Sequence, residues 1–134
     1  MREGNNLFLV TLSGPAEDPE TRRVMEAIAE TDRGVLHVAD AALIDVAALI
    51  SLSAVYVGND SGIAHLAGAL DTPACVLFGP TDPFLWRPLG HRVRIVTPHS
   101  GQDIASIPME EVYRTIGELL KSGDGPERGD AIGA

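Results

Sequence analysis

The sequence predicts an α/β domain in which helices cover both faces of a mostly parallel sheet. Short apolar runs of strand length alternate along the chain with segments whose apolar residues have helical spacing. These runs are nearly continuously apolar, as in strands buried on both faces. Polar turns follow three of them, at 13–17, 58–62 and 79–83. Because ligands of parallel sheets bind beyond the carboxyl ends of the strands, the three turns are candidates for one shared crevice.

The expected strands come from the apolar runs and from the turn residues that end them. The first run, 7–12, is followed by Ser13-Gly14-Pro15, and the second begins after Gly34. The third precedes the turn at Gly58, and the fourth lies between Pro73 and Gly79. We therefore expect strands at 7–12, 35–38, 55–57, 74–78 and 93–96.

The expected helices lie between and after these strands. A helix is predicted at 20–30 from the spacing of Val24, Met25 and Ile28, with Pro19 tolerated in its first turn, and a short one at 43–52. A third begins after Ser61 and ends near Pro73. A last helix is expected to use Ser106 as its cap and Pro108 in its first turn, and to run to about residue 120. It should bury Val112, Ile116, Leu119 and Leu120.

Composition limits the class of protein. The 134 residues suit a single domain at 1–120, and the polar, glycine-rich segment 121–134 predicts a disordered tail. The net charge of −9 argues against nucleic-acid binding. No apolar stretch is long enough to span a bilayer, and the N-terminus lacks the pattern of a secretion signal, so a cytoplasmic protein is expected. Cys75, the one cysteine, lies in an apolar run and should be a buried, inert thiol.

The segment from Val57 to His65 is the most informative stretch of the chain. An apolar strand, a turn of Gly, Asn, Asp and Ser, and the start of a helix follow one another there. The free N–H groups of a helix's first turn attract anions, and Ser61 or Asp60 is suited to cap this helix. Gly62 lets a ligand approach the backbone, and His65 lies one turn further on the same side. The segment predicts a phosphate or carboxylate site.

Each candidate also has a purely structural interpretation. Asp60 could serve only as a helix cap, His65 as a structural histidine and Glu17 as a solvated charge. Thr81 and Asp82 could do no more than shape a turn between two prolines. Trp86 is expected to pack against Pro83 and Pro88, and the cations near the third turn, Arg87 and Arg92, suit a surface role better than a diphosphate contact. Neither the histidines nor the carboxylates have the spacing of a metal site, so no metal is expected.

Three motifs in a fixed order resemble the signature of a known family. They are Gly58-Asn59-Asp60-Ser61-Gly62 with His65-Leu66-Ala67, then Leu77-Phe78-Gly79-Pro80-Thr81-Asp82-Pro83 with Trp86 and Pro88, and, upstream, Ser13-Gly14-Pro15-Ala16-Glu17. Together they cover roughly residues 7–120 and are similar to the heptosyltransferases, glycosyltransferase family 9. The resemblance implies a GT-B enzyme of two Rossmann-like domains, which moves heptose from ADP-heptose onto the lipopolysaccharide core. This chain resembles the C-terminal, donor-binding domain.

The resemblance also implies roles for individual residues. Glu17 would bind the ribose hydroxyls, and the segment Leu36, His37 and Val38 would line the adenine pocket. Asp60 would contact the sugar or orient the turn, and Ser61 and Gly62 would offer N–H groups to the diphosphate. The further candidates are Asn59, His65 and Thr81. No catalytic residue is assigned, because the general base of this family usually belongs to the acceptor domain.

The chain departs from the family pattern at its start. The usual first strand and helix of the donor domain, with a basic segment that helps to neutralise the leaving diphosphate, have no counterpart here, nor has the acceptor domain. The sequence is therefore interpreted as a fragment or a degenerate relative that is inactive alone. Because the absent strand normally lies in the middle of the sheet, a rearranged sheet, self-association through unpaired strand edges, or modest stability is expected.

The predicted function is thus the donor-binding half of a heptosyltransferase, in an enzyme that works at the inner membrane surface without a metal or other cofactor. Its expected partners are the nucleotide-sugar donor and the acceptor-binding domain. Two alternatives stay open. The chain could belong to a GT-B enzyme that uses a UDP-sugar, or it could be a non-catalytic module for nucleotide binding or for protein interaction.

Overall fold

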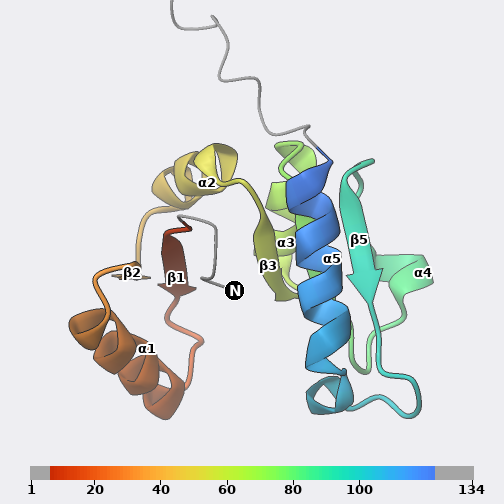
Figure 1. Ribbon diagram of the computed structural model, residues 1–134, viewed down its shortest axis with the longest axis horizontal. Coiled ribbons are helices and arrows are strands. Elements are labelled where there is room, and N and C mark those ends of the chain that lie inside the picture. Colours follow the sequence, from red (N-terminus) through yellow and green to blue (C-terminus); the bar gives the residue numbers. More distant parts are fainter. Residues whose placement is uncertain (1–6, 123–134) are drawn as a thin grey trace, which may run out of the picture. The chain divides into compact units, whose positions relative to one another are not determined.

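The computed structural model describes residues 7–122, in which strands and helices alternate and all strand pairs are parallel (Figure 1). The chain divides into two compact units, residues 1–45 and 46–134. The strands likewise form two separate sheets, of order β1-β2 and β3-β4-β5. The predicted α/β class with parallel sheets is therefore confirmed.

The first unit is a β-α-β element. Strand β1 (Leu9–Ser13) is followed by helix α1 (Pro19–Thr31) and strand β2 (Val35–Ala39), and β1 pairs with β2 from Leu9↔Val35 to Ser13↔Ala39. Asp18 caps α1 by accepting a 2.9 Å hydrogen bond from the Thr21 N–H, and Pro19 occupies the first turn as expected.

Apolar side chains of this unit remain open to solvent. Within its described residues Ser13 is the one buried side chain, while Val24 and Ile28 of α1 are 54% and 47% exposed. A bidentate ion pair joins α1 to the end of β2, with Arg22 donating to both carboxylate oxygens of Asp40 at 2.9 and 3.0 Å. This bond holds the pKa of Asp40 below its usual value.

The second unit carries the other sheet. Its elements in chain order are α2 (Leu43–Leu52), β3 (Tyr56–Asn59), α3 (Gly62–Ala69), β4 (Ala74–Leu77), α4 (Pro83–Trp86), β5 (Val93–Val96), a 3₁₀ turn (Ile104–Ser106) and α5 (Met109–Lys121). Helix α2 begins at the boundary between the units. The central strand β4 pairs with β3 on one side and with β5 on the other.

This sheet is covered by a helix on each face, so the unit has three layers. Cys75 belongs to the main core cluster, which also contains Val96, Ile107, Val112, Ile116 and Leu119. The α5 residues in that cluster place α5 on the Cys75 face of the sheet. Side chains alternate along a strand, so Ala74 and Val76 point to the opposite face, where α3 contacts β3 and β4. Both residues are fully buried.

Helix α3 is fixed by a close approach at Gly68. A Cβ at this position would overlap the main-chain oxygen of Leu89 and crowd the ring of Pro88, so only glycine lets the loop after α4 lie directly on the helix. The residue after the helix cap, Asp71, has a φ of 58°, in the left-handed region.

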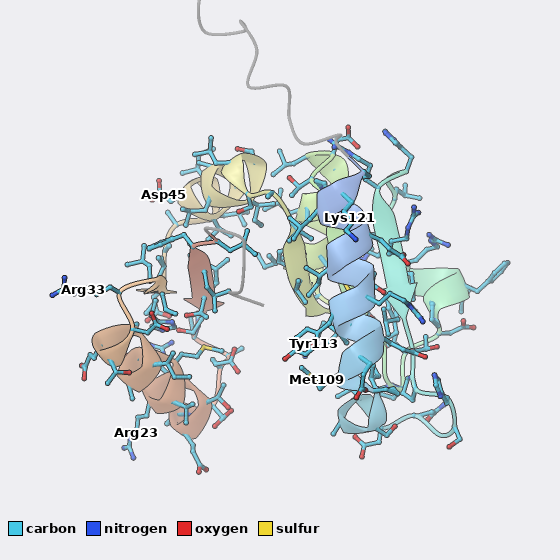
Figure 2. All side chains as sticks on the ribbon, viewed as in Figure 1. Arg23, Arg33, Asp45, Met109, Tyr113 and Lys121 are labelled. Carbon is cyan, nitrogen blue, oxygen red and sulfur yellow. The ribbon has the colours of Figure 1, made fainter. Side chains whose placement is uncertain are left out.

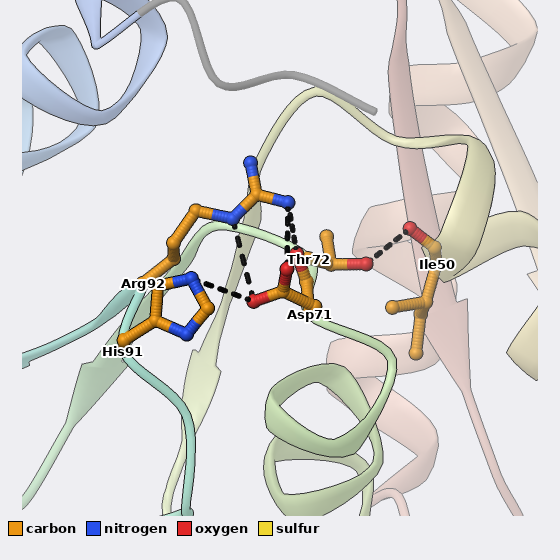
Figure 3. A network of polar contacts seen from close by, with 5 residues as sticks. All are labelled: Ile50, Asp71, Thr72, His91 and Arg92. Atoms are coloured by element: carbon orange, nitrogen blue, oxygen red, sulfur yellow. Dashed lines mark hydrogen bonds and ion pairs between the residues drawn. The ribbon is translucent and has the colours of Figure 1, made fainter. Parts of the chain in front are cut away.

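A polar network holds the segment after α3 at the amino ends of the strands (Figure 3). Arg92 donates to the Asp71 carboxylate at 3.2 Å, His91 is 3.5 Å from the same carboxylate, and the Thr72 hydroxyl donates to the main-chain oxygen of Ile50 at 3.0 Å. The Arg92 main-chain oxygen accepts from the N–H of Ala74, the first residue of β4. Arg92 therefore lies at the end of the sheet opposite the polar turns, and a diphosphate contact from its side chain is ruled out here.

Several expected details are corrected by the structure. Ser106 does not cap α5: its hydroxyl donates to the main-chain oxygen of Asp103 in the preceding 3₁₀ turn, and α5 starts after Pro108 without a side-chain cap. Leu120 is only partly buried. The short helix α4 was not expected, and Trp86, its last residue, is 56% exposed. Lys121 is helical, and the rest of the predicted tail, 123–134, lies outside the described residues.

The unpaired strand edges expected from the sequence are present within the described residues. Among the described residues, β1 pairs with β2 within its own sheet, and β3 pairs with β4 within the other. None of the helices in the described part of the chain is long and apolar enough to cross a membrane.

Cys75 provides a test of this core. Its thiol is fully buried, and burial raises its pKa from 9.0 to about 11. Between these values the unfolded chain loses the proton that the native state keeps, so the stability should be fully present below pH 9 and fall as the pH rises toward 11. A rise of this size in the pKa corresponds to a loss of about 2 to 3 kcal/mol in the free energy of unfolding. Urea unfolding at pH 8 and 11 should show this loss, and Cys75→Ala should lose less over the same interval. Parallel losses in both proteins would contradict the buried thiol.

Candidate functional site

The predicted anion-binding turn lies at the carboxyl end of β3. Its position is set by the pairing of β3 with β4, in which Asn59 lies opposite Leu77 and the Asp60 N–H donates to the Leu77 main-chain oxygen at 3.1 Å. The sheet hydrogen bonds thus continue one residue past the strand and hold the turn against the end of β4.

Ser61 is the residue that caps α3. Its backbone is extended, with φ −160° and ψ 169°, and its side chain accepts a hydrogen bond of 3.4 Å from the Ala64 N–H. The Asp60 carboxylate does not serve as this cap. The structural interpretation of Asp60 as a helix cap is therefore wrong, and its carboxylate stays available to a ligand.

The first turn of α3 is open to solvent. Ser61, Gly62 and His65 are exposed, whereas Asp60 is half-buried. A Cβ added at Gly62 would meet no atom within 4 Å, so no other part of the described chain packs against the turn at this position. The first N–H groups of a helix have no partner within the helix, and its positive dipole end favours anions. The turn therefore has the geometry of a phosphate-binding site.

Tyr56 is a residue of this site that the sequence analysis missed. Its phenol lies across Gly58, two residues later on the same face of β3, where any Cβ would overlap the ring and its hydroxyl. Burial raises the pKa of Tyr56, and the neighbouring Ser61 side chain offsets part of that rise. The signal that could have found it is a tyrosine in a predicted strand, two residues before the glycine that begins the predicted turn.

The third polar turn, 79–83, follows β4 and therefore lies at the same edge of the sheet as the Ser61 turn. Gly79 packs against the segment after β5, with its Cβ position 3.0 Å from the Gln102 main-chain oxygen. Asp82 caps α4 by accepting a 2.9 Å bond from the Phe84 N–H. Its carboxylate thus has a structural role, while Thr81 is half-buried in the turn.

The remaining predicted residues belong to the first unit. Glu17 is half-buried, and its N–H closes the turn after β1 with a 3.1 Å bond to the Gly14 oxygen. The His37 ring is held by two hydroxyls of β1, with Nδ1 2.9 Å from Thr11 Oγ1 and Nε2 3.0 Å from Ser13 Oγ. Both ring nitrogens are therefore engaged, and the ring is fixed on one face of the sheet.

The main chain of β2, unlike the His37 ring, has N–H and C=O groups that point away from β1. In the observed register the N–H and C=O groups of Leu36 and Val38 pair with β1, and those of His37 point away from it. Within residues 36–38, the His37 main chain is therefore the part that lies on the side of β2 facing away from β1. The structure gathers Glu17, Leu36, His37 and Val38 in one unit and Asn59, Asp60, Ser61, Gly62, His65 and Thr81 in the other.

Within residues 7–122 no group of three or more His, Cys, Asp or Glu side chains is placed to hold a metal ion. The electrostatic contribution that the described site offers to an anion comes from main-chain N–H groups and the α3 dipole.

Comparison with known proteins shows the family of this chain. Residues 3–111 match the model of glycosyltransferase family 9 (heptosyltransferase). The chain is 34% identical over 95 residues to lipopolysaccharide heptosyltransferase 2 of Salmonella typhimurium, covering 69% of this chain and 27% of that protein. It is 46% identical over 91 residues to a lipopolysaccharide heptosyltransferase 3 of Escherichia coli, covering 58% of this chain and 27% of that protein.

Solved structures give the same result. The E. coli ADP-heptose lipopolysaccharide heptosyltransferase II superposes with a TM-score of 0.72 at 28% identity, over 86% of this chain and 37% of that one. The E. coli heptosyltransferase WaaC with ADP superposes with a TM-score of 0.67 at 27% identity, over 78% and 32%. The chain thus spans about a quarter of the length of its curated relatives. On the extent of the family match and the shared fold, the chain belongs to the heptosyltransferases of glycosyltransferase family 9.

Proposed function

We propose that this chain supplies the donor-binding part of a glycosyltransferase that moves heptose from ADP-heptose onto a lipopolysaccharide core acceptor. The observation that carries the proposal is the open, Ser61-capped turn at the carboxyl end of β3, which presents the free N–H groups of α3 to solvent. The relatives support it, because two similar E. coli structures are of WaaC with ADP and with ADP-2-deoxy-2-fluoro heptose.

In this proposal the turn binds the diphosphate of the donor. The N–H groups of Ser61 and Gly62 donate to its oxygens, and Asp60 binds the sugar or orients the turn. His65 supports the turn from one helical turn further on, and Asn59 and Thr81 are further donor-binding residues. Glu17 binds the ribose, and the segment Leu36, His37 and Val38 contributes to adenine binding.

The chemical role of the site is electrostatic. As the bond between the sugar and the diphosphate breaks, negative charge builds up on the leaving diphosphate, and fixed N–H dipoles stabilise it without a metal. The net charge of −9 does not oppose this, since the α3 terminus supplies a local positive potential. The transfer is direct, without a covalent sugar–enzyme intermediate, and the general base that activates the acceptor belongs to an acceptor-binding domain. The complete enzyme works on the cytoplasmic side, at the inner membrane surface.

Nucleotide binding tests this proposal. Calorimetric titration of the folded chain with ADP, UDP and GDP should give saturable binding of ADP and weaker binding of the other two. Asp60→Ala and Glu17→Ala should each weaken ADP binding about ten- to a hundredfold, the weight of one hydrogen bond to a charged group. Glu30→Ala, which removes an exposed carboxylate from α1, is the matched control and should bind as the wild type does.

Two other outcomes of the titration would assign a different function to the chain. Tighter binding of UDP would show an enzyme that uses a UDP-sugar. A folded chain that binds no nucleotide would overturn the proposal and favour a non-catalytic interaction module.

We also propose that the edge of β1 that has no partner among residues 7–122 pairs with a second copy of this chain. Strand β1 has no charged residue, proline or bulge to discourage pairing, and its N–H and C=O groups at Val10 point away from β2 in the observed register. Antiparallel pairing of two β1 strands around a two-fold axis would satisfy these groups.

Sedimentation at several concentrations checks this pairing. The wild type should show a concentration-dependent dimer, and Val10→Pro, which removes the outward N–H, should be monomeric. Ala39→Pro is the matched control, because it removes an N–H from the outer edge of β2 and should leave the dimer intact. A wild-type monomer at all concentrations, or equal effects of the two prolines, would count against pairing through β1.

A further inference from the structure

Arg22 joins the ends of the two strands of the first unit. Its Nη2 atom donates to the main-chain oxygen of Gly14, just after β1, at 2.8 Å. The same guanidinium donates to both carboxylate oxygens of Asp40, just after β2, at 2.9 and 3.0 Å. Ion pairs near the surface usually contribute little to stability, but bidentate geometry and an additional main-chain bond favour one fixed position for this side chain. The Arg22 side chain is accordingly only 26% exposed.

Asp40 is held by its main chain as well as by the ion pair. Its φ of 52° lies in the left-handed region, which aspartate tolerates better than most residues. Its N–H donates to the main-chain oxygen of Ser13 at 2.9 Å and so continues the pairing of the two strands past the end of β2. The carboxylate that fixes Arg22 is therefore attached to a backbone that is itself tied to β1.

The Gly14 oxygen is also the point at which the turn carrying Glu17 closes. It accepts a 3.1 Å hydrogen bond from the Glu17 N–H in addition to the bond from Arg22. A carbonyl oxygen has two lone pairs, and these two donors use both of them. Arg22 thus holds, from α1, the oxygen on which the conformation of the turn depends.

We propose that Arg22 is a positioning residue, which keeps the turn of residues 14–17 in the conformation that directs the Glu17 carboxylate to the ribose of the donor. The inference deepens the proposed function and rests on it for the identity of the ligand. Asp40 acts through Arg22, and neither side chain touches the ligand. Both residues therefore matter for a ligand that contains a ribose and not for a diphosphate alone.

Arg23 provides a matched control for the change of charge. It is the next residue of α1, is exposed and projects into solvent (Figure 2). Arg23→Gln removes the same charge from the same helix as Arg22→Gln. Asp40→Gly is a second way to release Arg22. Because glycine adopts a φ of 52° without strain, this substitution should keep the backbone after β2.

The first measurement needs no ligand. Amide hydrogen exchange at Glu17 reports how firmly the turn is closed. Arg22→Gln and Asp40→Gly should each accelerate this exchange about fivefold, the effect of one lost hydrogen bond, and Arg23→Gln should leave it unchanged. Unchanged exchange in Arg22→Gln would overturn the inference whether or not the chain binds nucleotide. Equal acceleration at Val38, which lies within the sheet, would show a general loosening of the unit and would also contradict it.

The second measurement is titration with ADP and, separately, with inorganic pyrophosphate. Arg22→Gln should weaken ADP binding about fivefold, and in the Glu17→Ala background it should have no further effect, because it acts through that carboxylate. Pyrophosphate has no ribose and should bind to Arg22→Gln as it does to the wild type. Equal weakening of both ligands, or an undiminished effect in the Glu17→Ala background, would contradict the inference. A wild type that binds neither ligand would instead overturn the proposed function, and exchange at Glu17 would then decide the role of Arg22.

Discussion

The parallel pairing of β3 with β4 is the constraint on which the candidate site depends. The register places Asn59 opposite Leu77, and the bond from the Asp60 N–H to the Leu77 oxygen extends it into the turn. The polar turns after β3 and β4 consequently lie at the same edge of the sheet. The central strand of this sheet, β4, is buried on both faces. Gly68 then fixes α3 against the loop after α4, so the helix that provides the free N–H groups cannot shift along the sheet.

Local dipoles rather than net charge determine what this edge can bind. The chain carries a net charge of −9, yet the first turn of α3 lies in exposed residues, with no atom within 4 Å of the Cβ position of Gly62. Arg92, one of the cations considered for a diphosphate contact, is paired with Asp71 at the other end of the strands. The site is therefore built from main-chain groups and a capping serine, an arrangement that needs a well-fixed backbone.

Much of this could be predicted from the sequence, because apolar runs and turn residues act locally. The strands at β2 and β5, the helix at 43–52 and the exposed turn at Ser61 follow directly from such patterns. The position of the Tyr56 ring over Gly58 could not be predicted, since it depends on the side-chain conformation of that tyrosine. The cap of α5 was misassigned because Asp103, three residues before Ser106, forms a competing 3₁₀ turn. The salt bridge of Arg92 joins residues far apart in the sequence, and local patterns carry no information on it.

The most direct test of this account is a map of main-chain amide shifts on addition of ADP and, separately, of inorganic pyrophosphate. If the first turn of α3 binds the diphosphate, both ligands should produce their largest shifts at the amides of Ser61 and Gly62, and the two should compete. Large shifts at another helix terminus, such as the start of α5, with Ser61 and Gly62 unmoved, would contradict it.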